Sequence, residues 1–450
     1  MTSTDLRNLP AVHDIVEQLR QLLPDLPQSR LRTAARHAID ATRSLILSGK
    51  SVENSHDAIV RLAVRELHSQ IRPEALVNAT GVLLHTNLGR APLSQRARDA
   101  MLEASQACDV EYDLAEGARA SRNRLLAQSL GQLTGTDSGF IVNNCAAALV
   151  LALAGLGGRS TAIARSQIIE IGGGFRLPDI MRASGVALFE VGTTNRVKLQ
   201  DFADALDNGA DAILWMHRSN FDITGFVEEP DLKELRKLAT ERQVPLIYDL
   251  GTGAAWDMTQ FGLNAEPQIH DTLVQLADVT LFSGDKLFGG PQAGVLVGKS
   301  GAIETLGKHP LARALRADKV TLAAFGATLE AHLNGNLAEL PIHQMLAADE
   351  SILRQRAENI VTLVGHPALS VIDVVDTVGG GTMPTSQLKG IGVRIGAHSP
   401  ETLHSQLRSA TTPIVGRIQD EAYQLHMRTI PESQIETVAE ALRNVLAPVS

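Results

Sequence analysis

Residues 279–290 read VTLFSGDKLFGG, an apolar run that ends at a single lysine enclosed by glycines. The β-branched and aromatic residues at 279–282 are typical of a buried strand, and the glycines after them predict a sharp turn. Lys286 therefore comes just beyond a strand, with Ser283 three residues before it. Because most lysines in glycine-rich turns are solvated loop residues, its meaning depends on the rest of the chain.

Two further apolar runs upstream end in polar residues. Asp249 closes the run 245–248, and Asn220 follows the run 212–217, so that the three polar residues lie 29 and then 37 positions apart. This order is similar to that of pyridoxal-phosphate enzymes with the aminotransferase-like fold. In those enzymes the lysine holds the cofactor covalently, the aspartate pairs with the pyridine nitrogen, and the asparagine meets the phenolic oxygen. The structural alternatives are a helix cap for Asp249 and a loop residue for Asn220.

The wider pattern predicts an α/β fold with a mostly parallel central sheet. Short apolar, β-branched runs alternate with helical segments, at 138–143, 161–165, 186–191, 211–217, 245–250, 279–284 and 293–298. In such sheets ligands bind beyond the carboxyl ends of the strands. Five polar residues fall at those ends, namely Asn143, His217, Asn220, Asp249 and Ser283.

A phosphate group needs backbone donors at a helix N-terminus. The stretch NNCAAA (143–148) lies between a predicted strand and a helical run, and its small residues allow close approach to an anion. We therefore expect Asn144, Cys145 and Ala146 to bind a cofactor phosphate, with the hydroxyl of Ser283 as a further donor. Cys145 itself is interpreted as a small buried side chain rather than a reactive thiol. His217 has two interpretations, a contact with the cofactor ring or an ordinary polar contact.

Three domains are expected: a helical N-terminal domain at 1–73, a large cofactor-binding domain at 74–334 and a small α+β domain at 335–450. The first domain is predicted to hold helices at 9–23, 29–47 (with Ser29 as its cap) and 51–71. It carries 10 Lys and Arg against 8 Asp and Glu, whereas the whole chain has a net charge of -9. This balance permits contacts with nucleic-acid phosphates, although the segment could also simply pack on the main body.

The small C-terminal domain is expected to contain a helix near 349–364 and strands near 370–376 and 388–395. A hairpin around 413–430 and a final helix that begins near Pro431 complete it.

Composition indicates a globular protein of the cytoplasm. The 450 residues are 44% hydrophobic and 20% charged, and the two cysteines cannot form a disulfide framework. The start lacks the basic and apolar order of a signal peptide, and the longest apolar stretch, 145–158, is too short to span a membrane. No Cys/His cluster has metal-ligand spacing, so no metal is expected.

Five arginines form a second group of candidates: Arg90, Arg119, Arg122, Arg313 and Arg316. The last two are predicted to lie one helical turn apart on a shared face, which could hold an anion. Taken alone, such a pair is more often a solvated surface.

The residues together resemble one family, the bacterial selenocysteine synthases (L-seryl-tRNA(Sec) selenium transferases). The resemblance covers nearly the whole chain and rests on motifs that occur in order. They are NATGVLLHTNLGRAPL (78–93), EYDL (111–114), NNCAAA (143–148), EIGGGFRLPDIMRASG (170–185), EVGTTNR (190–196), SGDKLFGGPQAG (283–294), HPLARALRADKVTLAA (309–324) and PIVGRI (413–418). The chain departs from the family pattern at two places. Alanines, Ala118 and Ala120, flank Arg119 where family members have glycine beside the arginine, and Arg218 stands where they have threonine or lysine.

The resemblance implies pyridoxal 5'-phosphate on Lys286, catalytic roles for Asp285 and Arg119, and binding of selenophosphate by Arg90, Arg313 and Arg316. It also implies a homo-oligomer, a decamer built from five dimers, whose N-terminal domain binds the tRNA.

The implied reaction converts L-seryl-tRNA(Sec) into L-selenocysteinyl-tRNA(Sec) through β-elimination to a dehydroalanyl-tRNA and addition of selenium. Asp285 and His217 are both candidates for the proton donor to the leaving hydroxyl. Two alternatives remain, a pyridoxal-phosphate lyase that acts on a small amino-acid-like substrate without tRNA, and a non-catalytic tRNA-binding relative.

Overall fold

The computed structural model describes residues 6, 9–48, 54–69, 73–379, 381–396 and 399–446. The chain divides into two compact units. The large unit comprises 82–348 and 377–388, and the small unit comprises 1–81, 349–376 and 389–450. The three-domain division of the sequence stays a prediction.

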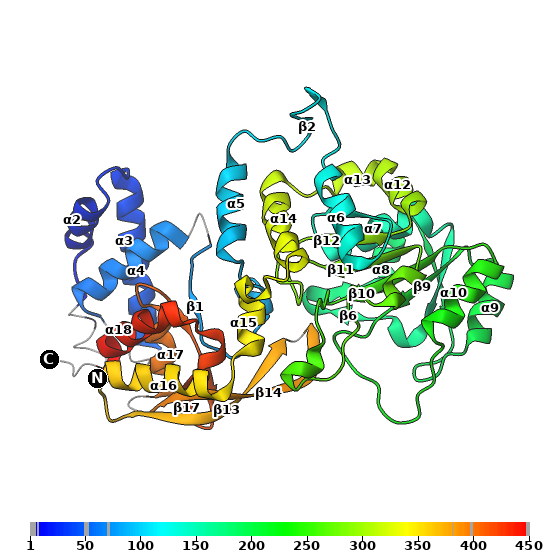
Figure 1. The fold of residues 1–450 in the computed structure, drawn as a ribbon. Coiled ribbons are helices and arrows are strands. Elements are labelled where there is room, and N and C mark those ends of the chain that lie inside the picture. The colour runs from blue at the N-terminus through cyan, green and yellow to red at the C-terminus, as the bar shows by residue number, and fades with distance from the viewer. Residues whose placement is uncertain are drawn as a thin grey trace. The chain divides into compact units, whose positions relative to one another are not determined.

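The core of the large unit is a seven-stranded sheet (Figure 1). In sheet order its strands are β4 (Ser138–Val142), β12 (Gly294–Gly298), β11 (Val279–Ser283), β10 (Leu246–Gly251), β9 (Ala212–Met216), β5 (Ser160–Ala164) and β8 (Ala187–Val191). All seven predicted strands are confirmed. In this sheet β12 runs opposite to the other six strands, so the sheet is mostly parallel as expected.

Helices cover both faces of this sheet, which is why its strands are apolar on both sides. In β9, for example, the adjacent residues Ile213 and Leu214 are both fully buried, one in each of two separate apolar cores. The core on one face includes residues of α7 (Cys145–Leu156), α8 (Leu177–Ala183) and α12 (Ser300–Lys308). The core on the other face includes residues of α6 (Arg124–Thr134), α9 (Leu199–Asp207), α10 (Leu232–Glu241) and α14 (Lys319–Leu333).

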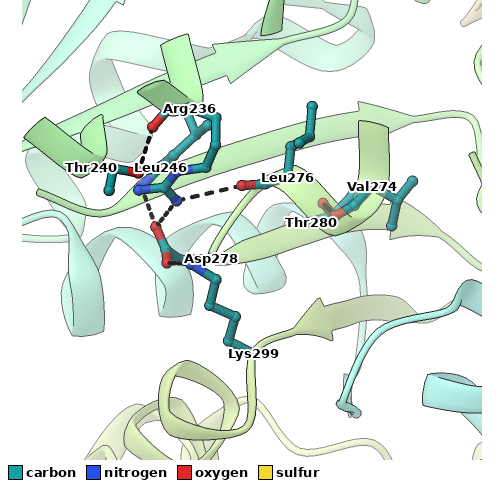
Figure 2. A network of polar contacts seen from close by, with 8 residues as sticks. All are labelled: Arg236, Thr240, Leu246, Val274, Leu276, Asp278, Thr280 and Lys299. Carbon is teal, nitrogen blue, oxygen red and sulfur yellow. Dashed lines mark hydrogen bonds and ion pairs between the residues drawn. The ribbon is translucent and has the colours of Figure 1, made fainter. Parts of the chain in front are cut away.

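A charged network fixes the amino ends of two central strands (Figure 2). The carboxylate of Asp278, just before β11, accepts hydrogen bonds from the backbone N–H of Leu246 at 2.8 Å, from Arg236 Nη1 at 2.8 Å and from Lys299 Nζ at 2.7 Å. Leu246 begins β10, Arg236 lies on α10 and Lys299 follows β12. The network therefore ties a covering helix and three neighbouring strands together at the edge opposite the carboxyl ends of β10 and β11.

The N-terminal part of the small unit contains three helices, α2 (Val12–Leu22), α3 (Gln28–Leu47) and α4 (His56–Ser69). Their apolar faces form a core of their own, so the three predicted helices are confirmed. The predicted cap at Ser29 is wrong, because α3 begins directly after Pro27 and Ser29 lies inside its first turn. Proline, which lacks an N–H, is well suited to precede a helix. The predicted end of the second helix at 47 is confirmed. The predicted limits of the third helix, 51 and 71, lie outside the described residues.

The remainder of the small unit is α+β. Asp349 caps α16 (Glu350–Val364), and α17 (Pro400–Arg408) and α18 (Ile435–Leu446) follow later in the chain. A second sheet contains β13 (Leu369–Gly379), β14 (Thr382–Ile395), β17 (Ala422–His426) and β16 (Arg417–Gln419). Residues 377–379 of β13 and 382–388 of β14 belong to the large unit. The predicted helix and the two predicted strands are confirmed, and the predicted hairpin corresponds to β16 and β17. The last α-helix begins at Ile435, a turn later than predicted. Among the helices of the described residues, none has the length and apolarity that crossing a membrane requires.

Candidate active site

The direction of the strands brings the predicted polar residues to one edge of the large sheet. Because β12 is antiparallel to both β4 and β11, those two strands run parallel to each other and to β10 and β9. Their carboxyl ends therefore lie along the same edge. Asn144 follows β4, His217 follows β9, Asp249 lies near the end of β10, and Ser283 ends β11.

Asp249 is a buried carboxylate with an unused oxygen. Its side chain lies at a position that is 7% exposed, and Oδ1 has no hydrogen-bond partner among the described residues. Burial raises the pKa of Asp249 to about 6, although the charges of Lys286 and His217 and a backbone hydrogen bond from Gly251 act in the opposite direction. A cationic donor beside a buried carboxylate stabilises its ionised form. The protonated nitrogen of a pyridine ring would be such a donor.

Lys286 lies beyond β11, half-buried, within electrostatic range of Asp249. Its Nζ donates a hydrogen bond to the carbonyl oxygen of Gly381 at 3.1 Å. Gly381 lies between β13 and β14, and Met383 N, two residues later, donates to Ser219 O at 3.1 Å. The sequence interpretation missed this contribution, for which the three consecutive glycines at 379–381 were the available signal.

The predicted phosphate loop forms the start of α7. Asn144 caps the helix, because its Oδ1 accepts a hydrogen bond from Ala147 N at 2.8 Å. The first N–H groups of a helix have no partner within the helix, so Cys145 and Ala146 belong to a turn that can bind an anion. Burial raises the pKa of the Cys145 thiol to about 12. The thiol is therefore neutral at physiological pH, which agrees with its interpretation as an unreactive side chain.

His217 and Asn220 both lie in the segment after β9. The backbone N–H of His217 donates to Asp249 O at 2.8 Å, and its Nε2 lies 3.2 Å from Glu266 Oε1. Glu266, whose side chain is 7% exposed, also accepts a hydrogen bond from Thr252 Oγ1 at 2.8 Å. Oδ1 of Asn220 is buried and has no hydrogen-bond partner among the described residues. The structure thus adds Glu266, which the sequence interpretation missed, as a neighbour of His217.

Asp285 and Arg90 form a close ion pair next to Lys286. Arg90 Nη1 donates to Asp285 Oδ2 at 2.8 Å, and the Asp285 side chain is 9% exposed. The backbone joins the same two segments, because Ala91 N donates to Asp285 O at 3.3 Å. Arg90 is therefore part of the site around Lys286.

Three other predicted arginines surround a carboxylate that the sequence interpretation did not single out. Glu111 lies 2.9 Å from Arg122, 3.2 Å from Arg316 and 3.8 Å from Arg119 (closest N–O distances). Arg119 ends the short hairpin formed by β2 (Tyr112–Asp113) and β3 (Ala118–Arg119).

The predicted helical pairing of Arg313 and Arg316 is wrong. The helix α13 (Pro310–Ala314) carries Arg313, which is exposed, and ends before Arg316. Arg316 forms an isolated antiparallel bridge with Val142, and Asn143 N donates to Leu315 O at 2.9 Å. The end of β4 thus binds this backbone in place of a further helical turn. As a consequence Arg316 lies beside the strand that leads into the phosphate loop.

Comparisons with known proteins give one family over most of the chain. Residues 76–431 match the family model described as L-seryl-tRNA selenium transferase. The L-seryl-tRNA(Sec) selenium transferase of Geobacter sulfurreducens is 38% identical, over 98% of this chain and 99% of that protein. The enzyme of the same name from Carboxydothermus hydrogenoformans is 37% identical, over 96% of each chain.

Among solved structures, a D-glucosaminate-6-phosphate ammonia-lyase is similar in fold, with a TM-score of 0.59 and 18% sequence identity. The similarity covers 84% of this chain and 98% of that one.

Proposed function

The chain belongs to the L-seryl-tRNA selenium transferase family, and we propose that Lys286, Asp249 and the first turn of α7 form its active site. It is a pyridoxal-phosphate-dependent enzyme with the aminotransferase-like fold, and it converts L-seryl-tRNA(Sec) into L-selenocysteinyl-tRNA(Sec). The observation that carries the assignment of the site is the buried Asp249 carboxylate, one oxygen of which has no hydrogen-bond partner in the described part of the chain, within electrostatic range of Lys286.

The residues at this edge fit pyridoxal phosphate. Asp249 Oδ1 would accept the hydrogen bond of the ring nitrogen, and its charge would keep that nitrogen protonated. Asn220 Oδ1, buried and unpartnered among the described residues, would meet the phenolic oxygen. The first turn of α7, with the hydroxyl of Ser283, would hold the phosphate. When bound, the cofactor supplies an electron-accepting ring for the electron pair that deprotonation of the α-carbon releases.

Lys286 has two tasks in this proposal. Its amine would hold the cofactor and, once free, would remove the proton from the seryl α-carbon. The carbonyl oxygen of Gly381 sets the direction of this amine, because Nζ donates to it at 3.1 Å. Asp285, the neighbouring residue, carries a charge that Arg90 balances at 2.8 Å. The Asp285 carboxylate, paired in this way, holds the Arg90 guanidinium group near the amine of Lys286.

We assign the selenium donor, selenophosphate, to Arg90, Arg313 and Arg316, and a catalytic role to Arg119. Guanidinium groups bind phosphate oxygens through paired N–H groups, so arginines suit an anionic donor. The helices of the small unit, α2 to α4, would bind the tRNA, and the chain would work as a decamer of five dimers in the cytoplasm. These assignments rest on the family and on the position of Arg316 beside β4.

A direct assay tests the proposal. The protein is supplied with seryl-tRNA(Sec) and selenophosphate, and the amino acid released from the tRNA is identified. The intact protein should yield selenocysteine, Lys286→Ala should yield serine, and Lys308→Ala, an exposed lysine on α12, should behave as the intact protein. Unchanged serine from the intact protein, or turnover of free serine without tRNA, would overturn the proposal.

A further inference from the structure

We propose that Glu111 is an internal anion of the arginine group, held by Arg122 and shared with Arg316, which a phosphate-bearing ligand must displace from Arg316 in order to bind. The arginine group is defined here as Arg119, Arg122 and Arg316. The inference rests on the proposed function in one respect only, namely that Arg316 binds the anionic selenium donor.

Four contacts place the carboxylate among the arginines. Arg122 donates from Nε to Glu111 Oε1 at 3.0 Å and lies 2.9 Å from it through Nη2. Arg316 Nη1 donates to the same oxygen at 3.2 Å. Arg119 Nη2 lies 3.8 Å from Oε2. Three guanidinium groups from two segments of the chain thus surround one carboxylate, and two of these groups, those of Arg122 and Arg316, contact the same oxygen.

The three arginines are not equally fixed. The Arg122 side chain is 17% exposed, binds Glu111 through two nitrogens, and also donates to Ala317 O at 2.9 Å. Arg316 is 40% exposed and meets Glu111 through Nη1 alone, while Arg119 is 81% exposed. An incoming anion can therefore take over Arg316 while Glu111 stays with Arg122.

The charges of the arginine group explain why Glu111 and an incoming anion compete for Arg316. Three guanidinium groups against one carboxylate leave a positive surplus, which attracts anions. The hydrogen bond from Arg122, followed by the charges of Arg316 and Arg119, lowers the pKa of Glu111 despite some desolvation. Glu111 is thus ionised at neutral pH, and it occupies Nη1 of Arg316, one of the nitrogens with which a guanidinium group binds phosphate oxygens. Its presence weakens anion binding and keeps Arg316 in a fixed place.

The test measures binding of inorganic phosphate to the full-length protein by isothermal titration calorimetry at low salt. In Glu111→Gln the dissociation constant should fall about two- to fivefold, the range expected for loss of an exposed competing charge. The fall should shrink at high salt because screening weakens exposed charges. Glu116→Gln is the matched control: it removes the same charge from the same hairpin, where Glu116 is exposed and makes no ion pair with the described residues.

Two further variants separate the proposed competition from simple support of the hairpin. Asp113→Asn breaks the ion pair with Arg124 on that hairpin and should leave phosphate binding unchanged. In an Arg316→Gln background, Glu111→Gln should have no further effect, because its action passes through Arg316. An unchanged or weaker affinity in Glu111→Gln, an equal gain in Glu116→Gln, or a gain that persists without Arg316 would overturn the inference. Phosphate binding needs no turnover. The calorimetric result for Glu111 can therefore be interpreted even if the selenium-transfer assay fails.

Discussion

At the scale of single residues, Asp249 is a carboxyl group whose ionisation is costly in the cofactor-free protein. Burial raises its pKa to about 6, above the value of roughly 3.9 expected in an unfolded chain. Between about pH 4 and 6 the unfolded chain is therefore ionised while the folded one still holds its proton, so stability falls as pH rises through this window. A cation at the position of the cofactor ring would remove this cost.

Asp249→Asn should remove that pH dependence. We expect the cofactor-free variant to be more stable than the parent at pH 7 by about 1–3 kcal/mol, and to bind pyridoxal phosphate far more weakly. Urea unfolding of both proteins from pH 4 to pH 8 measures the first effect, and titration of the cofactor-free protein measures the second. Asp204→Asn, an exposed carboxylate on α9, serves as the control. If the stability of Asp249→Asn fell with rising pH as much as that of the parent, the pH dependence would not come from Asp249.

The site residues that could be predicted are those that directly follow an apolar run, at the end of a predicted strand. Lys286, Asp249 and Asn220 follow three apolar runs, and the structure brings Lys286 and Asp249 together as expected. The residues that could not be predicted reach the site from distant segments. Gly381 is separated from Lys286 by 95 positions, and Glu111 from Arg316 by 205. Local periodicity contains no information about which loops close over a sheet edge, so such partners appear only in three dimensions.

At the scale of elements, the phosphate loop depends on a close approach of two backbones. A Cβ added at Gly294, the first residue of β12, would lie 2.1 Å from Asn144 O and 2.9 Å from Ala148 Cβ. Side chains cannot approach a backbone oxygen so closely, so α7 would have to move. The position of its first turn, and with it the phosphate site, is thus set by the absence of a side chain on the neighbouring strand.

Gly294→Ala should therefore weaken binding of pyridoxal phosphate by about tenfold or more and destabilise the fold by about 1–3 kcal/mol. Equilibrium titration and thermal unfolding measure the two effects. Gly307→Ala is the matched control, because its Cβ would meet the Phe140 ring at an ordinary 3.5 Å and alanine favours the helix α12. Equal cofactor affinity in the two variants would show that the close contact between Gly294 and Asn144 does not determine cofactor binding.

The network around Asp278 stabilises the opposite edge of the sheet. Burial acts to raise the pKa of Asp278, but hydrogen bonds from Lys299, from the backbone of Leu246 and from Arg236 outweigh it and lower the pKa. A carboxyl group whose pKa is depressed by folding stabilises the protein above its unfolded pKa, roughly 3.9, and this stabilisation is lost as pH falls through the folded value.

Asp278→Asn should lower the free energy of unfolding by about 1–3 kcal/mol at pH 7, because three donors lose a charged acceptor. The difference from the parent should nearly vanish once the pH falls below the folded pKa, which urea midpoints at pH 7 and in acid would reveal. Asp207→Asn, which breaks the exposed pair with Arg242, should cost about 0–1 kcal/mol. A penalty for Asp278→Asn that is the same at both pH values would argue against the electrostatic origin.

Elements are predictable where hydrophobic runs are long and regular. All seven strands of the large sheet follow from apolar, β-branched runs that helical segments separate. The stretch after Pro310 is wrongly predicted as a longer helix, because its spacing is helical while the backbone at Leu315 and Arg316 binds the end of β4. Tertiary hydrogen bonds override local propensity there, which no single-sequence pattern reports.

At the scale of the whole molecule, the proposed division of labour places tRNA binding in the small unit and chemistry in the large one. The helix α3 carries Arg32 and Arg36, which are exposed and lie four residues apart, and therefore share a face. Lys286 and Asp249 lie in the large unit. Neutralising the two arginines should consequently affect tRNA without affecting the cofactor.

We expect Arg32→Gln/Arg36→Gln to weaken binding of tRNA(Sec) and to reduce the dependence of log K on log salt by up to about one for each phosphate that an arginine no longer neutralises. Affinity for pyridoxal phosphate should stay unchanged. The charge-matched control is Arg159→Gln/Arg182→Gln, which removes two exposed arginines of the large unit. Filter binding at several salt concentrations measures the affinity of each double variant for tRNA(Sec). Equal losses in both double variants would mean that tRNA responds only to overall charge, and no loss in the first would remove this face of α3 from the tRNA site.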